Sequence, residues 1–440
     1  MSFRKALAVA GAVALTAGLA ACGGGDDSGG GGKTLDVLIA ANTQYPQEQA
    51  AWQKSIGDKF KTQTGASIRW ETFASANDEL TKIQTSVVAG SGPDVYAVGT
   101  TFTPTAYSTK AFVTLGDAEW QKIGGKEKFI PSTLGISGPD QSSQVGIPWV
   151  GRPFVMVYNT ELLKAAGITK PAATWDELTQ QAKQLTKPGQ YGLAVGYKDN
   201  FDPWKFIWQM SIQAGNPIVD GKTARIDDPI AKKAYQTYFG WLTNDKVVDP
   251  AAVGWTNAQA LAAFAKGKTG YFALTSALAA KALDAGDVKG KWAFTLLPTV
   301  PPGATSRPAG GVEAASILSG DNLLVADYSK NKDLAFQFVK LITDKDAQLE
   351  IYQQLGQLPD NAEAAQGLLT DPRLKPVIEA QQKSVATPFT GAWGDIQLAL
   401  TNTVVQSLPD LAGGAMSDAQ IDTRVAAAQK TAQSALDRAK

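Results

Sequence analysis

Between residues 35 and 98, apolar runs of strand length alternate with segments whose apolar residues have helical spacing. Residues 35–40 form a short apolar run of strand length. Trp52, Ile56 and Phe60 then recur at the four-residue spacing of a helix. The same pattern repeats downstream. We expect strands over 35–40, 67–73 and 94–98, a helix that ends at Gly65, and a second helix over about 77–89.

This order of strand, helix, strand, helix and strand is typical of a parallel sheet in an α/β lobe. Polar segments follow two of the strands, at 42–45 and at 100–102. Ligands bind at the carboxyl ends of the strands in such sheets. Gln44, Thr101 and Phe102 are therefore candidate ligand-binding residues of a first lobe.

A different pattern occupies residues 147–159. Residues 154–158 are an uninterrupted apolar run, which suits a strand covered on both faces. Before this run lie Trp149, which we expect to be exposed, and a lone charge, Arg152. Such an interrupted segment, in a chain too long for one core, predicts a crossing between two lobes with a ligand cleft beside it. The residues that interrupt regular structure are Pro148, Gly151 and Pro153.

The rest of the chain predicts a second lobe and a return to the first. Thr174 and Glu177 form a capping box that opens a helix, and the Pro/Gly-rich residues 298–308 are expected to be a return linker. From about residue 371 the chain is expected to be nearly all helical. Further expected elements are helices over 203–214, 229–244, 257–266, 332–343 and 346–355, and strands over 192–195, 269–274, 292–297 and 323–326.

Composition excludes several classes of function. A chain of 440 residues is expected to form two domains, and its 41 basic and 41 acidic residues give no electrostatic case for nucleic acid. The sequence contains no histidine, the commonest metal ligand and general base. We therefore expect no metal, no cofactor and neither Ser-His-Asp nor Cys-His catalysis.

The N-terminal residues are typical of a targeting segment. Arg4 and Lys5 form a positive n-region, and residues 6–19 are apolar or small, too short a run to span a bilayer but suited to a signal peptide. Small residues then precede Cys22, which resembles the lipobox of bacterial lipoproteins. That resemblance implies that residues 1–21 are removed and that Cys22 is lipidated. The alternative is a cysteine that is lost with the leader.

Cys22 is the only cysteine, so we expect no intrachain disulfide on the oxidising side of the membrane. The glycine-rich residues that follow it cannot bury apolar surface and predict a flexible tether over 22–32. Its root-mean-square reach is roughly 16–19 Å. We expect an extracytoplasmic protein, anchored by lipid close to the cell membrane.

Six segments carry a family resemblance. They are the lipobox at Cys22, Gly92-Pro93-Asp94-Val95, Ile147-Pro148-Trp149 leading to Val157-Tyr158-Asn159, Thr174-Trp175-Asp176-Glu177-Leu178, Phe264-Ala265-Lys266-Gly267-Lys268, and Ser329-Lys330-Asn331-Lys332-Asp333. In this order they resemble the extracellular solute-binding proteins of bacterial ABC importers, in the carbohydrate-binding branch that includes maltose-binding proteins. The resemblance covers essentially the whole chain.

The resemblance implies an α/β, two-lobed periplasmic-binding-protein-like fold of type II. Each lobe is a sheet flanked by helices, with a hinge and a cleft between the lobes. The N-terminal lobe is expected to comprise 33–150 plus about 312–370, and the C-terminal lobe 151–311 plus about 371–440. The resemblance further implies a monomer without enzymatic activity, which captures a sugar or oligosaccharide in the cleft and delivers it to an ABC permease.

A sugar offers hydroxyl groups and flat C–H faces, so its site needs planar polar side chains and aromatic rings. The second lobe offers Asp202, Trp204 and Trp208, of which the two tryptophans share a helical face. The resemblance adds Asp321 and Asn322, before the return strand, and Trp393, where the family often stacks a sugar ring. The full set of candidates is Gln44, Thr101, Phe102, Trp149, Arg152, Asp202, Trp204, Trp208, Asp321, Asn322 and Trp393.

Each of these residue types also has an ordinary structural role. Asp321 suits a turn, Arg152 suits an ion pair, and Asp94 heads a strand and is expected to be structural. For Trp393→Ala we expect weaker sugar binding with nearly unchanged thermal stability. Tryptophans are more often core than ligand platforms, and we assign Trp52, Trp175, Trp241 and Trp292 to the core.

Two departures from the family leave alternatives open. Relatives often place an acidic residue near Arg152, whose guanidinium only donates hydrogen bonds. This favours an anionic or acetylated ligand, a polyol or glycerol phosphate, or internal pairing of Arg152 with Asp321. Relatives also often carry an aromatic residue within the segment at 274–278, which here has none. A secreted glycoside hydrolase is a further alternative, for which Asp202 and Asp321 are the only pair nominated.

Overall fold

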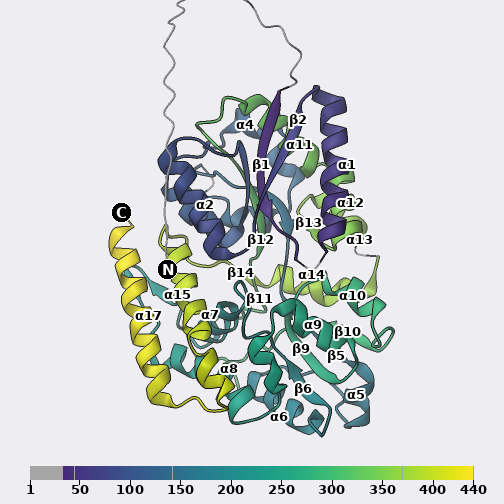
Figure 1. Cartoon of the computed structure of the whole chain (residues 1–440), viewed down its shortest axis with the longest axis vertical. Helices are drawn as coiled ribbons and strands as arrows, with labels where there is room; N and C mark the ends of the chain where they lie inside the picture. The colour runs from purple at the N-terminus through teal and green to yellow at the C-terminus, as the bar shows by residue number, and fades with distance from the viewer. Residues whose placement is uncertain (1–32, 44, 141, 369, 440) are drawn as a thin grey trace, which may run out of the picture. The chain divides into compact units, whose positions relative to one another are not determined.

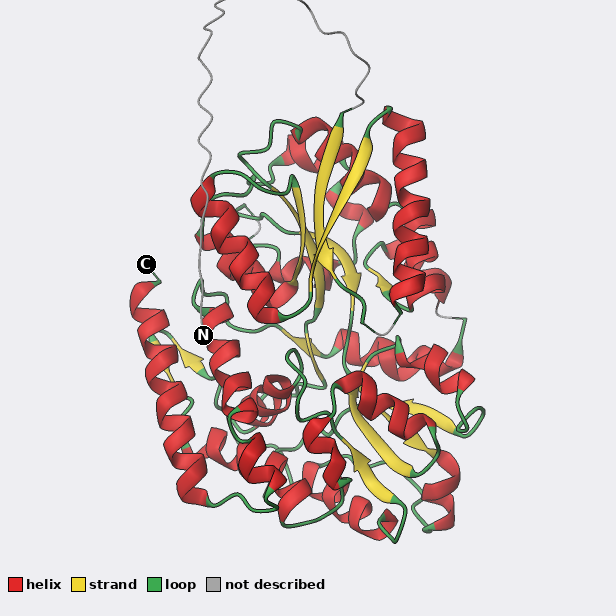
Figure 2. Ribbon diagram, in the orientation of Figure 1, coloured by secondary structure: helices red, strands yellow, loops and turns green. Residues whose placement is uncertain are grey.

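The computed structural model describes residues 33–439, apart from residues 44, 141 and 369 (Figure 1). The expected signal peptide, tether and lipidated Cys22, and the proposed role of Gln44, lie outside the described residues. Two larger sheets organise the described chain, and helices flank each of them (Figure 2). Among the residues described, no helix combines the length and the apolar character needed to cross a membrane.

The first sheet has six strands in the order β13-β4-β12-β3-β1-β2. β1 pairs in parallel with β2 and with β3, which confirms the predicted parallel arrangement, whereas β12 is antiparallel to β3 and β4. Val37 and Leu38 on β1 enter two different apolar clusters, one on each face of the sheet. The strands are β1 (Thr34–Ala40), β2 (Ser67–Phe73), β3 (Val95–Gly99), β4 (Ile147–Gly151), β12 (Gly320–Val325) and β13 (Leu358–Pro359).

Amphipathic helices cover this sheet. Trp52, Ile56 and Phe60 are the buried residues of α1 (Pro46–Thr64), which ends at Gly65 with φ 73°, as the sequence predicted. Asp94 also has the expected structural role, since its carboxylate accepts hydrogen bonds from Asp36 N and Ser329 Oγ. The other helices are α2 (Ala76–Ala89), α3 (Thr103–Ser108), α4 (Asp117–Lys122), α11 (Lys332–Thr343), α12 (Lys345–Leu355) and α13 (Ala362–Leu368), with 3-10 turns at Thr100–Phe102, Lys126–Lys128 and Pro131–Ile136.

The chain crosses from the first sheet to the second between β4 and β5 (Val155–Asn159). The prediction of a crossing here is confirmed, but the expected exposure of Trp149 is wrong. Trp149 lies on β4, is only 4 % exposed, and its ring centroid is 5.7 Å from that of Trp52 on α1. Pro148 does not interrupt the strand, because it faces a β-bulge at Asp321 and Asn322 of the neighbouring strand.

The second sheet has the order β10-β5-β9-β6. β5 is covered on both faces, as predicted, because Val155 and Val157 enter one apolar cluster and Met156 enters another. The remaining strands are β6 (Tyr191–Ala194), β9 (Thr269–Thr275) and β10 (Trp292–Thr295). The helices of this region are α5 (Thr160–Ala165), α6 (Trp175–Leu185), α7 (Pro203–Gln213), α8 (Pro229–Thr243), α9 (Asn257–Ala265) and α10 (Ala279–Ala285), with a 3-10 turn at Pro250–Gly254 and a hairpin of β7 (Val219–Asp220) and β8 (Thr223–Ala224).

The C-terminal segment is largely helical, as expected, and returns to the second sheet's helices. α15 and α17 pack against α7 and α8. A short parallel pair, β11 (Ser316–Ile317) with β14 (Ser384–Val385), lies between the two larger sheets in Figure 1. The helices are α14 (Lys375–Gln382), α15 (Trp393–Val405), α16 (Leu408–Ala412) and α17 (Asp418–Arg438), after a 3-10 turn at Pro372–Leu374.

Candidate functional site

A cavity of about 270 Å³ is lined by residues from both larger sheets and from the segments that join them. This volume lies just below the usual range of ligand pockets, about 300–1,000 Å³. Most of its polar lining residues lie at strand ends and helix starts. The aromatic lining residues are Trp52, Phe73, Phe102, Trp149, Phe154, Phe201 and Trp204, and the charged ones are Glu79, Arg152, Asp202, Lys205 and Asp321.

An ion pair between Arg152 and Asp321 lies where the chain crosses between the sheets. Arg152 Nη2 donates to Asp321 Oδ1, and the side chains are 23 % and 5 % exposed. The backbone N–H of Arg152 also donates to Ser319 O at 2.8 Å, and its guanidinium lies 3.4 Å from Gly320 O. Arg152 therefore joins two crossing segments, and the alternative of internal pairing with Asp321 is confirmed.

A second ion pair joins Asp202 and Lys205 at the start of α7. Burial raises the pKa of Asp202, and the nearby Lys205 opposes this shift. The Lys205 ammonium also lies 4.2 Å from the ring centroid of Phe154, a cation–π geometry that holds it over this ring. Both cations that line the cavity in the described chain are thus paired with a carboxylate.

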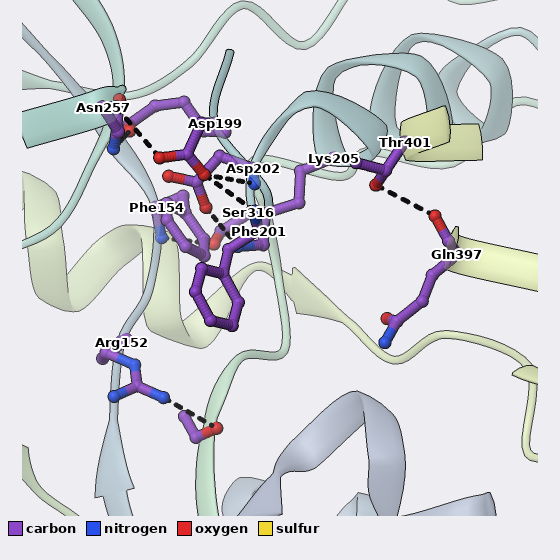
Figure 3. Close-up of polar contacts among 12 residues, drawn as sticks. Arg152, Phe154, Asp199, Phe201, Asp202, Lys205, Asn257, Ser316, Gln397 and Thr401 are labelled. Atoms are coloured by element: carbon purple, nitrogen blue, oxygen red, sulfur yellow. Dashed lines mark hydrogen bonds and ion pairs between the residues drawn. The ribbon is translucent and has the colours of Figure 1, made fainter. Parts of the chain in front are cut away.

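Asp199 fixes the loop that presents Asp202. Its Oδ1 accepts from the backbone N–H groups of Phe201 and Asp202, at 2.8 and 3.0 Å, and its Oδ2 accepts from Asn257 N at 2.9 Å (Figure 3). One carboxylate therefore holds the loop that leads into α7 against the start of α9. Lone Asp residues in loops carry little sequence signal, and the role of Asp199 was not predicted.

Glu79 is a further lining residue that the sequence interpretation missed. It lies in the first turn of α2, is 2 % exposed, and its Oε1 accepts from Gly99 N at 2.7 Å. Burial raises the pKa of this carboxyl to about 8. The sequence did indicate that Glu79 would be buried, because it is four residues before Ile83 and so lies on the same helical face.

The structure brings seven of the eleven predicted site residues together. These are Thr101, Phe102, Trp149, Arg152, Asp202, Trp204 and Asp321. Gln44 is outside the described residues. The other three do not line the cavity, because other parts of the fold cover them.

Trp208 and Trp393 are 1 % and 0 % exposed within an apolar cluster, and the ring of Trp393 packs against that of Trp204 at 5.8 Å. Asn322 is buried and donates from Nδ2 to Thr103 Oγ1 at 3.0 Å. Their roles in ligand binding therefore stay untested predictions, and the structure places all three in packing positions.

Contacts also bridge the two sides of the cavity. Tyr45 Oη donates to Leu278 O at 2.9 Å, and Lys281 Nζ lies 2.5 Å from Glu48 Oε1. Tyr45 and Glu48 belong to the start of α1, whereas Leu278 and Lys281 belong to the start of α10. In this structure the two sides of the cavity are therefore in direct contact.

The sheets, the crossings and the lined cavity define a two-lobed α/β protein of the solute-binding class. The chain belongs to the family described as bacterial extracellular solute-binding protein, whose family model matches residues 43–349. Diacetylchitobiose binding protein DasA of Streptomyces coelicolor is 26 % identical over 415 residues, which cover 90 % of this chain and 91 % of that protein.

Two solved structures share the fold. The maltose-bound MalE3 of T. maritima superposes with a TM-score of 0.75 at 18 % identity, over 90 % of this chain and 99 % of that one. An ABC transporter solute-binding protein from Thermotoga lettingae, bound with α-D-tagatose, gives a TM-score of 0.75 at 20 % identity, over 92 % and 100 % of the two chains. The predicted α/β, two-lobed fold is confirmed.

Proposed function

We propose that the cleft captures a neutral sugar or short oligosaccharide and that the protein delivers it to the membrane subunits of an ABC importer. The observation that carries the proposal is the lining of the cavity, in which aromatic rings lie among polar and charged groups from both sheets, their helices and the segments that join them. Rings can pack on the C–H faces of a sugar, and the polar groups can bond its hydroxyls.

The pairing of the charges favours a neutral ligand over an anionic one. Arg152 is bonded to Asp321 and Lys205 is bonded to Asp202. An anion that approached either cation would have to displace a carboxylate that is already mostly buried, and would leave that carboxylate without its partner. A neutral hydroxyl can accept or donate a bond at the edge of either pair without breaking it.

The relative from Streptomyces coelicolor supports this substrate class, because it is named for binding diacetylchitobiose and matches nine-tenths of this chain. Closure of the lobes would bury the sugar, and the pair of Glu48 and Lys281, which is already formed in this structure, is a contact that the closed state would keep. We further propose lobe boundaries of 33–150 with about 312–370, and 151–311 with about 371–440. The assignment of the strands to the two larger sheets supports this division. We propose a monomer and no catalytic step.

A thermal-shift screen tests the substrate class. N,N′-diacetylchitobiose and maltose serve as neutral sugars, with glycerol 3-phosphate and glucose 6-phosphate as anionic controls. A ligand that binds only the folded state stabilises it, by about 2.7 kcal/mol at a concentration of 100 times Kd. We expect at least one neutral sugar to raise Tm and neither phosphate to do so. A rise with the phosphates alone would replace this proposal with the anionic alternative.

We also propose that the protein is exported and that Cys22 carries the lipid anchor, with residues 1–21 as signal peptide and 22–32 as tether. The apolar run that ends in small residues before a single cysteine supports this. We expect wild-type protein in the membrane fraction of expressing cells and Cys22→Ser in the soluble extracytoplasmic fraction. Membrane association of both proteins alike would remove Cys22 as the anchor.

A further inference from the structure

Glu79 is an acidic side chain on an otherwise apolar helical face that borders the cavity. Ala76, Leu80 and Ile83 are its buried neighbours on α2. The helix start is fixed by Ser75, whose side chain accepts from Asp78 N at 3.1 Å. Burying a carboxyl group at this position costs free energy. Its few hydrogen-bond partners therefore determine which bonds it can still form with a ligand.

The carboxyl of Glu79 has one hydrogen-bond partner within the described chain. Its Oε1 accepts from Gly99 N, and Oε2 has no partner there. A Cβ added to Gly99 would lie 3.6 Å from Glu79 Oε1 and 3.6 Å from a ring carbon of Phe102. The carboxyl and the aromatic ring therefore share one corner of the cavity, where a sugar would meet a ring face and a polar group together.

No cation of the described chain forms an ion pair with the Glu79 carboxyl. Arg152, a cation that lines the same cavity, is bonded to Asp321, and these two groups shift the pKa of Glu79 in opposite directions. Burial is the largest influence and raises the pKa of Glu79 to about 8, so the group is mostly protonated at pH 7. The other charged groups on α2 and on the elements packed against it are Asp78 and Lys82 on α2, Arg69 and Glu71 on β2, and Asp395 on α15, and none of them bonds the Glu79 carboxyl.

We propose that Glu79 is a specificity-determining residue of the cleft, whose carboxylic acid donates a hydrogen bond to a hydroxyl of the bound sugar. This proposal rests on the proposed function. A carboxylate can only accept hydrogen bonds, whereas the acid also offers an O–H. A site that contains a buried donor discriminates against ligands that leave it unpaired, which selects a hydroxyl-rich ligand in one orientation.

Binding of N,N′-diacetylchitobiose and of maltose is measured by calorimetry between pH 6.5 and 9.5. If only the protonated form binds, wild-type affinity falls about tenfold between pH 7 and pH 9 as the acid is lost. Glu79→Gln keeps one donor and one acceptor, so we expect affinity within about threefold of wild type at pH 7 and no loss up to pH 9. Glu79→Ala should bind at least about tenfold more weakly.

Asp395→Asn is the matched control. It removes a carboxylate from α15, which packs against α2, yet Asp395 does not line the cavity. Its affinity and pH profile should equal those of wild type. A fall in affinity at high pH that persists in Glu79→Gln, or wild-type affinity in Glu79→Ala, would overturn the role of Glu79 and leave sugar binding standing.

A readout without sugar separates the two proposals. Carbon-13 NMR of the glutamate carboxyls in the ligand-free protein identifies Glu79 as the signal that is missing from Glu79→Gln, and this signal should titrate near pH 8. A midpoint near that of an exposed glutamate overturns the donor role even where sugar binds. If neither sugar binds wild-type protein, the function proposed above and the role of Glu79 are both wrong.

Discussion

Arg152→Ala is expected to lower the free energy of unfolding by about 3–5 kcal/mol, because it leaves Asp321 buried without its counterion. Because the Asp321 side chain is only 5 % exposed, water cannot replace the lost counterion. The same change removes the guanidinium bond to Gly320 O, which fastens the crossing segments together. Urea unfolding monitored by circular dichroism measures the loss.

The double variant Arg152→Met with Asp321→Leu is the control for this prediction. Removing both charges leaves no uncompensated ion, so it should be clearly more stable than Arg152→Ala alone. Lys54→Met removes an ion pair with Asp58 in which the side chains are 78 % and 67 % exposed, and should cost no more than about 1 kcal/mol. Equal losses in Arg152→Ala and in the double variant would contradict the assignment of the penalty to a stranded carboxylate.

Trp393→Ala should lower the free energy of unfolding by about 3–5 kcal/mol, because it removes a large side chain from a closed core. Trp393 is 0 % exposed and packs against Trp204, which lines the cavity. The sequence suggested the opposite outcome for this substitution, weaker sugar binding with unchanged stability. Affinity should now fall only because Trp204 loses its support.

Trp393→Phe separates packing from ligand contact. The indole N–H of Trp393 has no hydrogen-bond partner in the described chain. Replacing the indole with a phenyl ring therefore reduces the buried volume without breaking a hydrogen bond. We expect a smaller loss of stability than for alanine and near wild-type sugar affinity. Unchanged urea unfolding in Trp393→Ala, together with weaker binding, would instead restore the direct stacking role.

Local patterns predicted the elements well because apolar period and chain punctuation are local properties. The strand at 154–158 was recognisable from its uninterrupted apolar run, and the end of α1 from Gly65. Trp52, Trp175, Trp241 and Trp292 are buried, as assigned, with exposed fractions of 8 % or less, although Trp52 also lines the cavity. Seven of the predicted site residues line the cavity because strand ends and helix starts meet there in this class of fold.

The two tryptophans whose exposure the sequence misjudged were buried for the same reason. Trp149 follows a proline and looked exposed, but Trp52 from α1 covers it. Trp393 begins a helix between two glycines and looked available, but the helix that carries Trp204 closes over it. In each case the covering residue is far away in sequence, so no local pattern could reveal the burial.

The sequence by itself determined the order of strands and helices, the crossing at Arg152 and the kinds of side chain available to a ligand, since these follow from spacing and residue type. The tertiary structure decided which of those side chains reach the cavity and in what charge state. Arg152 and Lys205 form ion pairs with Asp321 and Asp202 within the protein. The pKa of Glu79 is raised because α2 buries its carboxyl beside Gly99 and Asp321. Burial and pairing depend on distances between segments far apart in the chain, and only the folded arrangement fixes those distances.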